Sequence, residues 1–142
     1  MVMSPVLRTL LCAALFTGAS ASAEVVVVVS AKSPATALTQ EQAADIFLGR
    51  STTLPGAGAA VALDQAEGAA ARDEFYQKTA GKSSAQLKAY WSKQIFSGKG
   101  QPPKAVADSA SVKSQLAGNP NLVGYIDKSA LDASVKPLLT VK

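Results

Sequence analysis

Five consecutive valines at residues 25–29 constrain the fold of this chain more than any other feature of its sequence. β-Branched side chains favour extended backbone, and a short apolar run without polar alternation is typical of a strand that is buried on both faces. The polar residues Glu24 and Ser30 bound the run on either side. The run therefore predicts a buried strand at the centre of a sheet.

The segment before the valines is organised like a secretory signal peptide. Arg8 is its one charged residue, an apolar run covers residues 10–16, and small residues follow until Ala-Ser-Ala at 21–23. That tripeptide fits the small-x-small pattern of signal peptidase sites, and the apolar run is much shorter than the roughly 20 residues that span a bilayer. We expect a signal peptide at 1–23, export to the periplasm and no membrane span after cleavage. A buried helix or a retained anchor is the alternative.

The remaining chain, 24–142, has the size of one domain. Removing 23 of the 142 residues leaves 119, which suits one domain with one core. The single cysteine, Cys12, leaves with the signal peptide, and so does Arg8, so 13 basic and ten acidic residues remain. This mild positive excess suits an anionic small ligand without requiring one. The lysines are dispersed along the sequence and are not clustered with aromatic residues, so no nucleic-acid partner is expected.

Helices and strands are expected to alternate along this domain. Thr39 is a good N-cap, with Gln42 in the capping-box position and Gly49 as a C-terminal stop, and Ser83 begins another helix with Gln86 in the same relation. Further predicted elements are a strand at 61–63 ending at Asp64, a helix at 69–79 ending at Gly81, a stripe of Leu87, Trp91 and Ile95 buried on the helix after Ser83, a short helix capped by Ser109, and strands at 122–126 and 135–141. The alternation predicts a layered α/β domain.

The residue types exclude most enzyme chemistry. The chain has no histidine, and without Cys12 it has no thiol, which removes the commonest general base, a nucleophile and the usual transition-metal ligands. The Ser-x-x-Lys, nucleophile-elbow, P-loop and dinucleotide-binding patterns are also absent. Asp64 and Glu67 are the one candidate carboxylate pair, and their spacing in a turn is weak support for a hydrolase. We therefore expect a binding module with no catalytic residue, no metal and no cofactor.

The segment 64–72 is the best candidate for a binding site. It leads from the end of a strand through a glycine turn into a helix, and ligands of α/β sheets bind at the carboxyl ends of strands. A helix N-terminus offers unpaired N–H groups to an anion, small residues allow close approach, and Arg72 adds a cationic fork if its side chain turns back. The alternative is that Glu67 only caps the helix dipole and Arg72 is solvated. The predicted ligand-binding residues are Asp64, Gln65, Glu67, Gly68, Ala69, Ala70, Ala71 and Arg72, with Ser30 and Ser33 after the first strand facing them.

Three segments, in order, resemble phosphate ABC-transporter substrate-binding proteins. Residues 38–50 (LTQEQAADIFLGR) resemble the stretch L-T-x-x-x-L-A-D-I-Y-L-G-K of that family. Residues 64–75 (DQAEGAAARDEF) lie where the family carries its phosphate loop, R-x-D-G-S-G-T, and residues 119–126 (NPNLVGYI) are similar to its N-P-G-A-I-G-Y strand. Residues 90–103 resemble the short, single-domain members. The resemblance covers nearly all of 37–127.

The resemblance implies one lobe of a periplasmic binding protein-like fold, with a central mixed sheet flanked by helices. It also implies inorganic phosphate or a similar oxyanion as ligand, and an ABC permease or another periplasmic protein as partner. Glu67 and Gly68 match the acidic and glycine positions of the loop, whereas Ala69 and Ala71 stand at its hydroxyl positions and Ala70 at its second glycine. The alternative function is an adaptor that binds proteins and no solute, through Lys88, Trp91, Lys93 and the loop 97–103.

Overall fold

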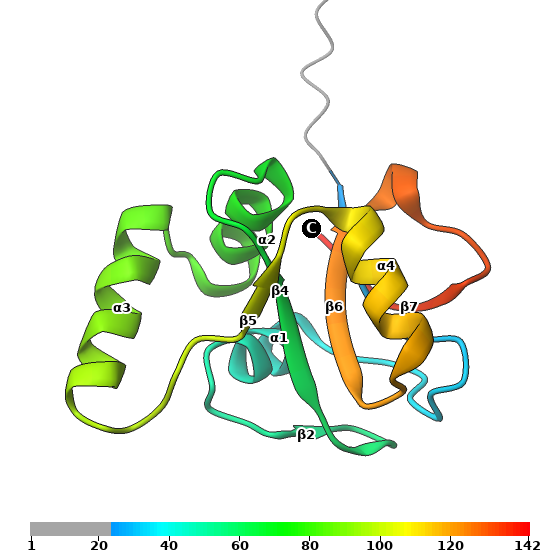
Figure 1. Cartoon of the computed structure of the whole chain (residues 1–142), viewed down its shortest axis with the longest axis horizontal. Helices are drawn as coiled ribbons and strands as arrows, with labels where there is room; N and C mark the ends of the chain where they lie inside the picture. Colours follow the sequence, from blue (N-terminus) through cyan, green and yellow to red (C-terminus); the bar gives the residue numbers. More distant parts are fainter. Residues whose placement is uncertain (1–23) are drawn as a thin grey trace, which may run out of the picture.

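A computed structural model describes residues 24–142, so the predicted signal peptide at 1–23 lies outside the described residues. A mixed five-stranded sheet forms the middle of the domain, with helices on both faces (Figure 1). The strands are β1 (Val25–Ser30), β4 (Val61–Gln65), β5 (Lys104–Val106), β6 (Leu122–Asp127) and β7 (Val135–Val141), and a separate hairpin pairs β2 (Thr53–Leu54) with β3 (Gly58–Ala59). The predicted α/β class is confirmed.

The strand order is β5-β4-β6-β1-β7. β4 runs parallel to both β5 and β6, whereas β1 is antiparallel to β6 and to β7. Within this sheet β1 therefore runs against the other four strands. The valine strand has a neighbour on each side, as its composition predicts, and every one of its residues is buried.

The helices are α1 (Gln40–Phe47), α2 (Ala70–Ala80), α3 (Ser84–Phe96), α4 (Ser109–Gly118) and a short 3-10 turn, η1 (Lys128–Ala130). The valines of β1 alternate between two hydrophobic cores. Val25, Val27 and Val29 pack on the side of α1, α2 and α3, whereas Val26 and Val28 pack on the side of α4. Both faces of β1 are thus covered, which explains why the run shows no polar alternation. None of the helices within 24–142 is long and apolar enough to cross a membrane.

The predicted helix signals mostly act as expected. Thr39 and Ser83 each form a complete capping box with the glutamine three residues later. Gly81 ends α2 in the left-handed region, at a φ of 63°, which glycine adopts without steric cost. The N-cap of α4 is Asp108 rather than the predicted Ser109, because the Asp108 carboxylate accepts a 2.9 Å hydrogen bond from the N–H of Ser111.

Three further features differ from the sequence prediction. Ile95, expected in the buried stripe of α3, is 55% exposed, because α3 packs mainly through Leu87 and Trp91. Strand β5 and the β2–β3 hairpin are too short to produce an alternating pattern and were not predicted.

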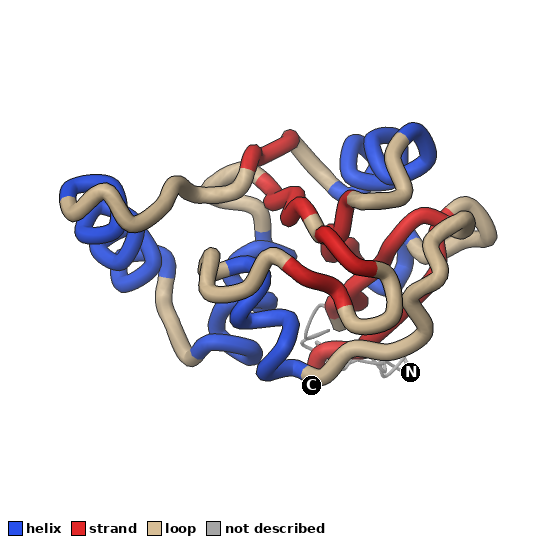
Figure 2. The backbone as a smooth tube through the Cα atoms, turned by 90° about the horizontal axis from the view of Figure 1, so that it is seen from below, coloured by secondary structure: helices blue, strands red, loops and turns tan. Residues whose placement is uncertain are grey.

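In the view from below, α3 lies at one end of the molecule, apart from the other helices (Figure 2).

Candidate functional site

Asp64 is the centre of a buried polar cluster at the carboxyl end of β4. Its side chain accepts a 2.6 Å hydrogen bond from the hydroxyl of Tyr76, a second from the hydroxyl of Tyr125, and a 2.8 Å bond from the N–H of Gln65. The residue itself is only 2% exposed. A buried carboxylate needs such partners, because leaving it unpaired away from water is costly. The Asp64 carboxylate is therefore occupied by donors of the protein itself.

The two tyrosines are held as hydrogen-bond donors. Burial raises the pKa of Tyr76, and the negative charge of Asp64 raises it further. Burial, followed by the charge of Asp64, raises the pKa of Tyr125 in the same direction. A phenol that resists ionisation keeps its proton for the carboxylate, so the cluster stays intact when the pH rises.

Arg72 turns back from α2 toward the end of β4, as the anion-site hypothesis requires. Its Nη1 donates a 3.0 Å hydrogen bond to the carbonyl oxygen of Gln65 and lies 3.8 Å from Oδ2 of Asp64. The guanidinium also lies over the ring of Tyr76, 5.7 Å from the centroid. Its Nε is buried and has no hydrogen-bond partner among the described residues. Among the described residues the guanidinium therefore donates to the protein through Nη1 alone.

Gln65 has a structural role. Its Nε2 donates to the carbonyl oxygen of Tyr125 at 2.9 Å and to Oγ of Ser109 at 3.3 Å. Ser109 in turn donates to Asp127 at 3.2 Å. These bonds connect β4, β6 and the start of α4. Like Asp64, Gln65 is 2% exposed, so its side chain fixes the sheet beneath the turn instead of pointing into solvent.

The turn after β4 presents backbone rather than side chains. Gly68 has a φ of 94°, a conformation that favours glycine, and Glu67 and Gly68 are exposed. Ala69 is the N-cap of α2, and no side chain caps that helix. The N–H groups of Ala69 and Arg72 bind the carbonyl oxygens of Ala66 and Ala69, which leaves those of Ala70 and Ala71 to solvent or to an anion. Ala70 is exposed and Ala71 is buried, and neither offers a hydroxyl.

A cleft of about 310 Å³ opens beside this turn, between α3 and the loop before β5. Two cationic side chains and one acidic side chain line it: Arg72, Lys88 and Glu67. Its other walls are Ser84, Trp91, Ser92, Ile95, Pro102, Pro103 and Ala105. Ser84 and Ser92 bring hydroxyl groups from α3. The cleft therefore combines positive charge with hydroxyl donors.

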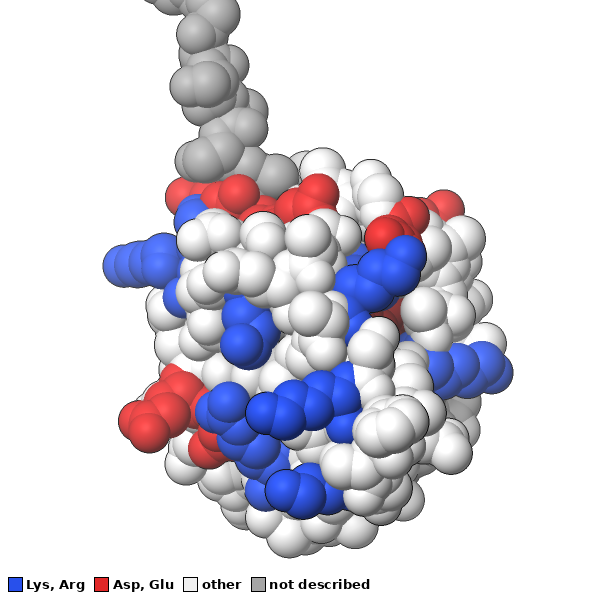
Figure 3. All heavy atoms as spheres, turned by 90° about the vertical axis from the view of Figure 1, so that its left-hand side faces the viewer, with Lys and Arg blue, Asp and Glu red and all other residues white. Residues whose placement is uncertain are grey.

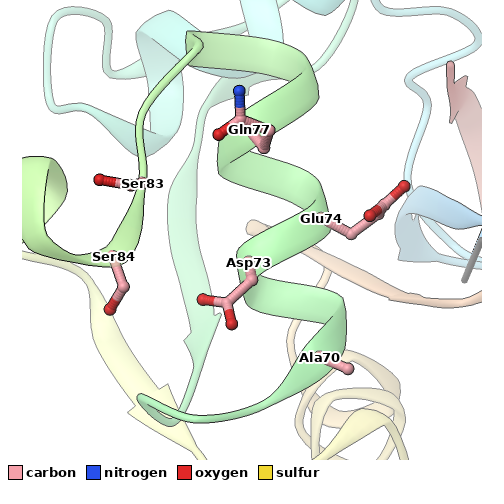
Figure 4. A pocket seen from close by; sticks show the side chains of 6 residues that line it. All are labelled: Ala70, Asp73, Glu74, Gln77, Ser83 and Ser84. Carbon is pink, nitrogen blue, oxygen red and sulfur yellow. The ribbon is translucent and has the colours of Figure 1, made fainter.

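A larger cleft, of about 460 Å³, lies between α2 and the start of α3 and shares Ser84 with the basic cleft (Figure 4). It is lined by Ala70, Asp73, Glu74, Gln77, Ser83 and Ser84, and no basic residue contributes to it. Asp73 points toward the start of α3 and Glu74 points away, where it pairs with Lys78 at 2.5 Å. The carboxylate of Asp73, which forms no ion pair among the described residues, repels an anion. Because charge outweighs volume for an anionic ligand, we take the smaller, basic cleft as the candidate site. Within 24–142 no three His, Cys, Asp or Glu residues are grouped as metal ligands.

The structure does not bring Ser30 and Ser33 to this site. β1 is antiparallel to β6, which is parallel to β4, so the carboxyl end of β1 lies at the opposite edge of the sheet from Gln65. Both hydroxyls are also engaged locally. Ser30 accepts from the N–H of Lys32 and Ser33 from the N–H of Ala35. The reversed direction of β1 could not be inferred from its composition alone.

Sequence reasoning missed the two tyrosines that hold Asp64. Tyr76 lies four residues after Arg72 in the same helix, a spacing that places them on one face. Tyr125 belongs to a strand whose residues 123–126 are all buried, and only a tertiary contact connects it with Asp64. The first tyrosine could have been found from helical spacing, whereas the second could not.

Searches of family models and of curated proteins give no match to this sequence. Solved structures do match. A phosphate ABC transporter substrate-binding protein with bound phosphate from Clostridium perfringens superposes with a TM-score of 0.64 at 24% identity, over 81% of this chain and 44% of that one. An ABC-type phosphate transport receptor from Vibrio cholerae gives 0.63 at 21% identity, over 81% and 45%. PstS from Borrelia burgdorferi gives 0.60 at 13% identity, over 81% and 46%.

These likenesses concern the fold, since identities below 25% do not carry function with them. This chain spans less than half the length of each of the three proteins. The helices and the mixed sheet described above correspond to that shared part. The chain therefore has the fold of one lobe of a periplasmic binding protein, as found in phosphate transport proteins.

Proposed function

We propose that residues 24–142 form an exported, non-enzymatic domain that binds phosphate or a similar oxyanion at the turn between β4 and α2. The observation that carries this proposal is the orientation of Arg72. Its guanidinium lies at the wall of the basic cleft, and Nη1 is its one nitrogen that donates a hydrogen bond to the protein among the described residues. An oxyanion accepts charge-assisted hydrogen bonds from such a group, and Lys88 adds a second positive charge across the cleft.

The same geometry predicts weak binding. Asp64 lies 3.8 Å from Arg72 and offsets part of its charge, and Ala69, Ala70 and Ala71 contribute no hydroxyl. A hydrogen bond to a charged group contributes roughly 1.5–3 kcal/mol, so two missing hydroxyl donors lower the affinity by ~2–4 decades. We therefore expect dissociation constants in the millimolar range. The phosphate-binding neighbours support phosphate as the first ligand to test, and an ABC permease as the first partner.

The adaptor hypothesis loses one of its contacts in the structure. Trp91 was one of its three named side chains, but it is 6% exposed and packs in the core with Leu87. Lys88 lines the anion cleft. Lys93, the loop 97–103 and the exposed Phe96 remain on the outside of α3.

Calorimetric titration of phosphate and sulfate into the protein tests the proposal. We expect binding that is lost in Arg72→Lys and Lys88→Gln, while Lys32→Gln, an exposed lysine on another face, binds as the parent does. The Lys88 variant removes a charge without touching the Asp64 cluster, so a folding defect cannot account for its result. Heat of binding that survives both site variants, or no saturation at tens of millimolar of either anion, would contradict the proposal.

A further inference from the structure

The positive charge of this domain is concentrated around α3. Residues 82–107 contain five lysines and no aspartate or glutamate, whereas the rest of 24–142 contains eight basic and ten acidic residues. The surface over α3 shows basic side chains, with acidic groups toward its margins (Figure 3). The expectation of dispersed lysines is therefore wrong for this segment, although no two of its lysines are adjacent in the sequence. The lysines are Lys82, Lys88, Lys93, Lys99 and Lys104.

These lysines have no carboxylate partner among the described residues. Each ion pair within 24–142 uses another cation, such as Arg50 with Asp45 or Lys113 with Asp132. Lys82 lies over the ring of Tyr90, and the other four lysines are exposed. Their charge is therefore available to an external anionic partner.

An apolar tip accompanies this charge. Phe96, the last residue of α3, is 95% exposed, and Ile95 is 55% exposed. The opposite side of the helix is buried through Leu87 and Trp91, so turning α3 would not cover Phe96 without exposing the core. Lys93 and Lys99 flank the tip along the chain. Gly98, at a φ of 69°, turns the chain away directly after it.

We propose that this tip and its lysines bind the surface of an anionic phospholipid membrane. Phe96 and Ile95 enter the boundary between headgroups and acyl chains, and Lys93 and Lys99 contact lipid phosphates. A membrane suits the surface better than a protein does. Protein interfaces need about 800 Å² per partner around an apolar centre and are depleted of lysine, whereas this face carries apolar side chains at one end and lysines elsewhere. A fluid bilayer needs only a protruding aromatic tip and nearby positive charge.

Vesicle co-sedimentation of the full chain tests this proposal separately from the anion cleft, because the substituted residues Phe96, Lys93 and Lys99 do not line that cleft, whereas Ile95 does and stays unchanged. Vesicles contain phosphatidylcholine alone or with 30% phosphatidylglycerol. The first 23 residues are the same in every variant and cancel from the comparison. The variants are Lys93→Gln/Lys99→Gln, Phe96→Ser and the control Lys32→Gln/Lys128→Gln, which removes two lysines outside the α3 segment.

We expect the parent to bind the anionic vesicles more strongly than the neutral ones. A lysine near such a surface raises partitioning about fivefold, so the Lys93/Lys99 variant should bind ~25-fold more weakly and the control should lose much less. Phe96→Ser should weaken binding about tenfold and remove the part that survives 0.5 M salt. Absence of binding, or equal loss in the control, would overturn the proposal. So would binding of a polyglutamate peptide through Lys93 and Lys99 without vesicle binding, which would point to an acidic protein.

Discussion

Two regions of this domain differ in how their charged groups are placed: one buries a charge among hydrogen-bond donors, and the other exposes charges to solvent. At the end of β4, the charge of Asp64 is buried and surrounded by donors from Tyr76, Tyr125 and Gln65. Around α3, lysines stand in solvent without partners and a phenylalanine is almost fully exposed. A buried charge that loses a partner is expensive, whereas an exposed one contributes little to stability. The Asp64 cluster should therefore contribute to the stability of the domain. The surface of α3 should instead determine which external partner the domain binds.

The largest expected effect is that of Asp64→Ala. The substitution leaves the two buried phenols without their acceptor and removes the carboxylate that lies 3.8 Å from Arg72, so we expect a loss of ~3–5 kcal/mol in the free energy of unfolding. Urea denaturation followed by circular dichroism measures it. Asp45→Ala is the matched control, because its 3.6 Å pair with Arg50 is exposed and should contribute less than about 0.5 kcal/mol. Equal losses in the two variants would show that the contrast between buried and exposed charge is wrong.

The second prediction concerns alkaline pH. Burial and Asp64 raise the pKa of Tyr76 and Tyr125 in the folded state, whereas unfolded tyrosines ionise near pH 10. Above pH 10 the unfolded state binds fewer protons than the folded state, so stability is fully present below pH 10 and falls as the pH rises. Two such groups give a slope of up to about 2.7 kcal/mol per pH unit.

Urea midpoints at pH 9, 10 and 11 measure this slope, and Tyr125→Phe should reduce it by about half. A parent protein whose stability does not change between pH 9 and 11 would show that the phenols ionise as readily in the fold as outside it.

Sequence alone predicted the parts of the molecule that depend on local chemistry. The capping boxes at Thr39 and Ser83, the stop at Gly81 and the valine strand need only neighbouring residues, and all four are confirmed. The direction of β1 depends on pairing with strands about a hundred residues away, which is why Ser30 was assigned to the wrong edge. The exposure of Ile95 depends on which side of α3 meets the core.

The candidate site also has features that local sequence predicts and features that depend on tertiary contacts. The glycine turn and the returning Arg72 follow from strand, turn and helix in succession, so the sequence indicated them. The role of Asp64 does not follow, because Tyr125 reaches it from 61 residues away. Lys88 joins the cleft only because α3 folds back beside the turn. A ligand residue supplied by a distant element carries no local signal.

A third prediction contrasts two glycines. A Cβ at Gly124 in β6 would lie 2.6 Å from Cγ1 of Val112, whereas one at Gly100, after α3, would meet no atom within 4 Å. Because a packed core resists added volume, Gly124→Ala should cost ~1–3 kcal/mol and Gly100→Ala almost nothing. Thermal unfolding of both variants measures the two losses. If Gly124→Ala did not change the unfolding temperature, α4 could shift away from the sheet.

A small effect on stability is expected for Phe96→Ser, which compares an exposed aromatic ring with a buried one. At 95% exposure the ring loses almost no water on folding, so its removal should change the free energy of unfolding by less than about 0.5 kcal/mol. Phe75, fully buried and stacked on Tyr125 at 4.3 Å, is the matched position, where Phe75→Ala should cost ~3–5 kcal/mol. If Phe96→Ser also destabilised the isolated domain, its ring would belong to the core of the folded chain in solution. A neutral result would show that Phe96 does not stabilise the fold, so any loss of vesicle binding in Phe96→Ser could not be attributed to unfolding.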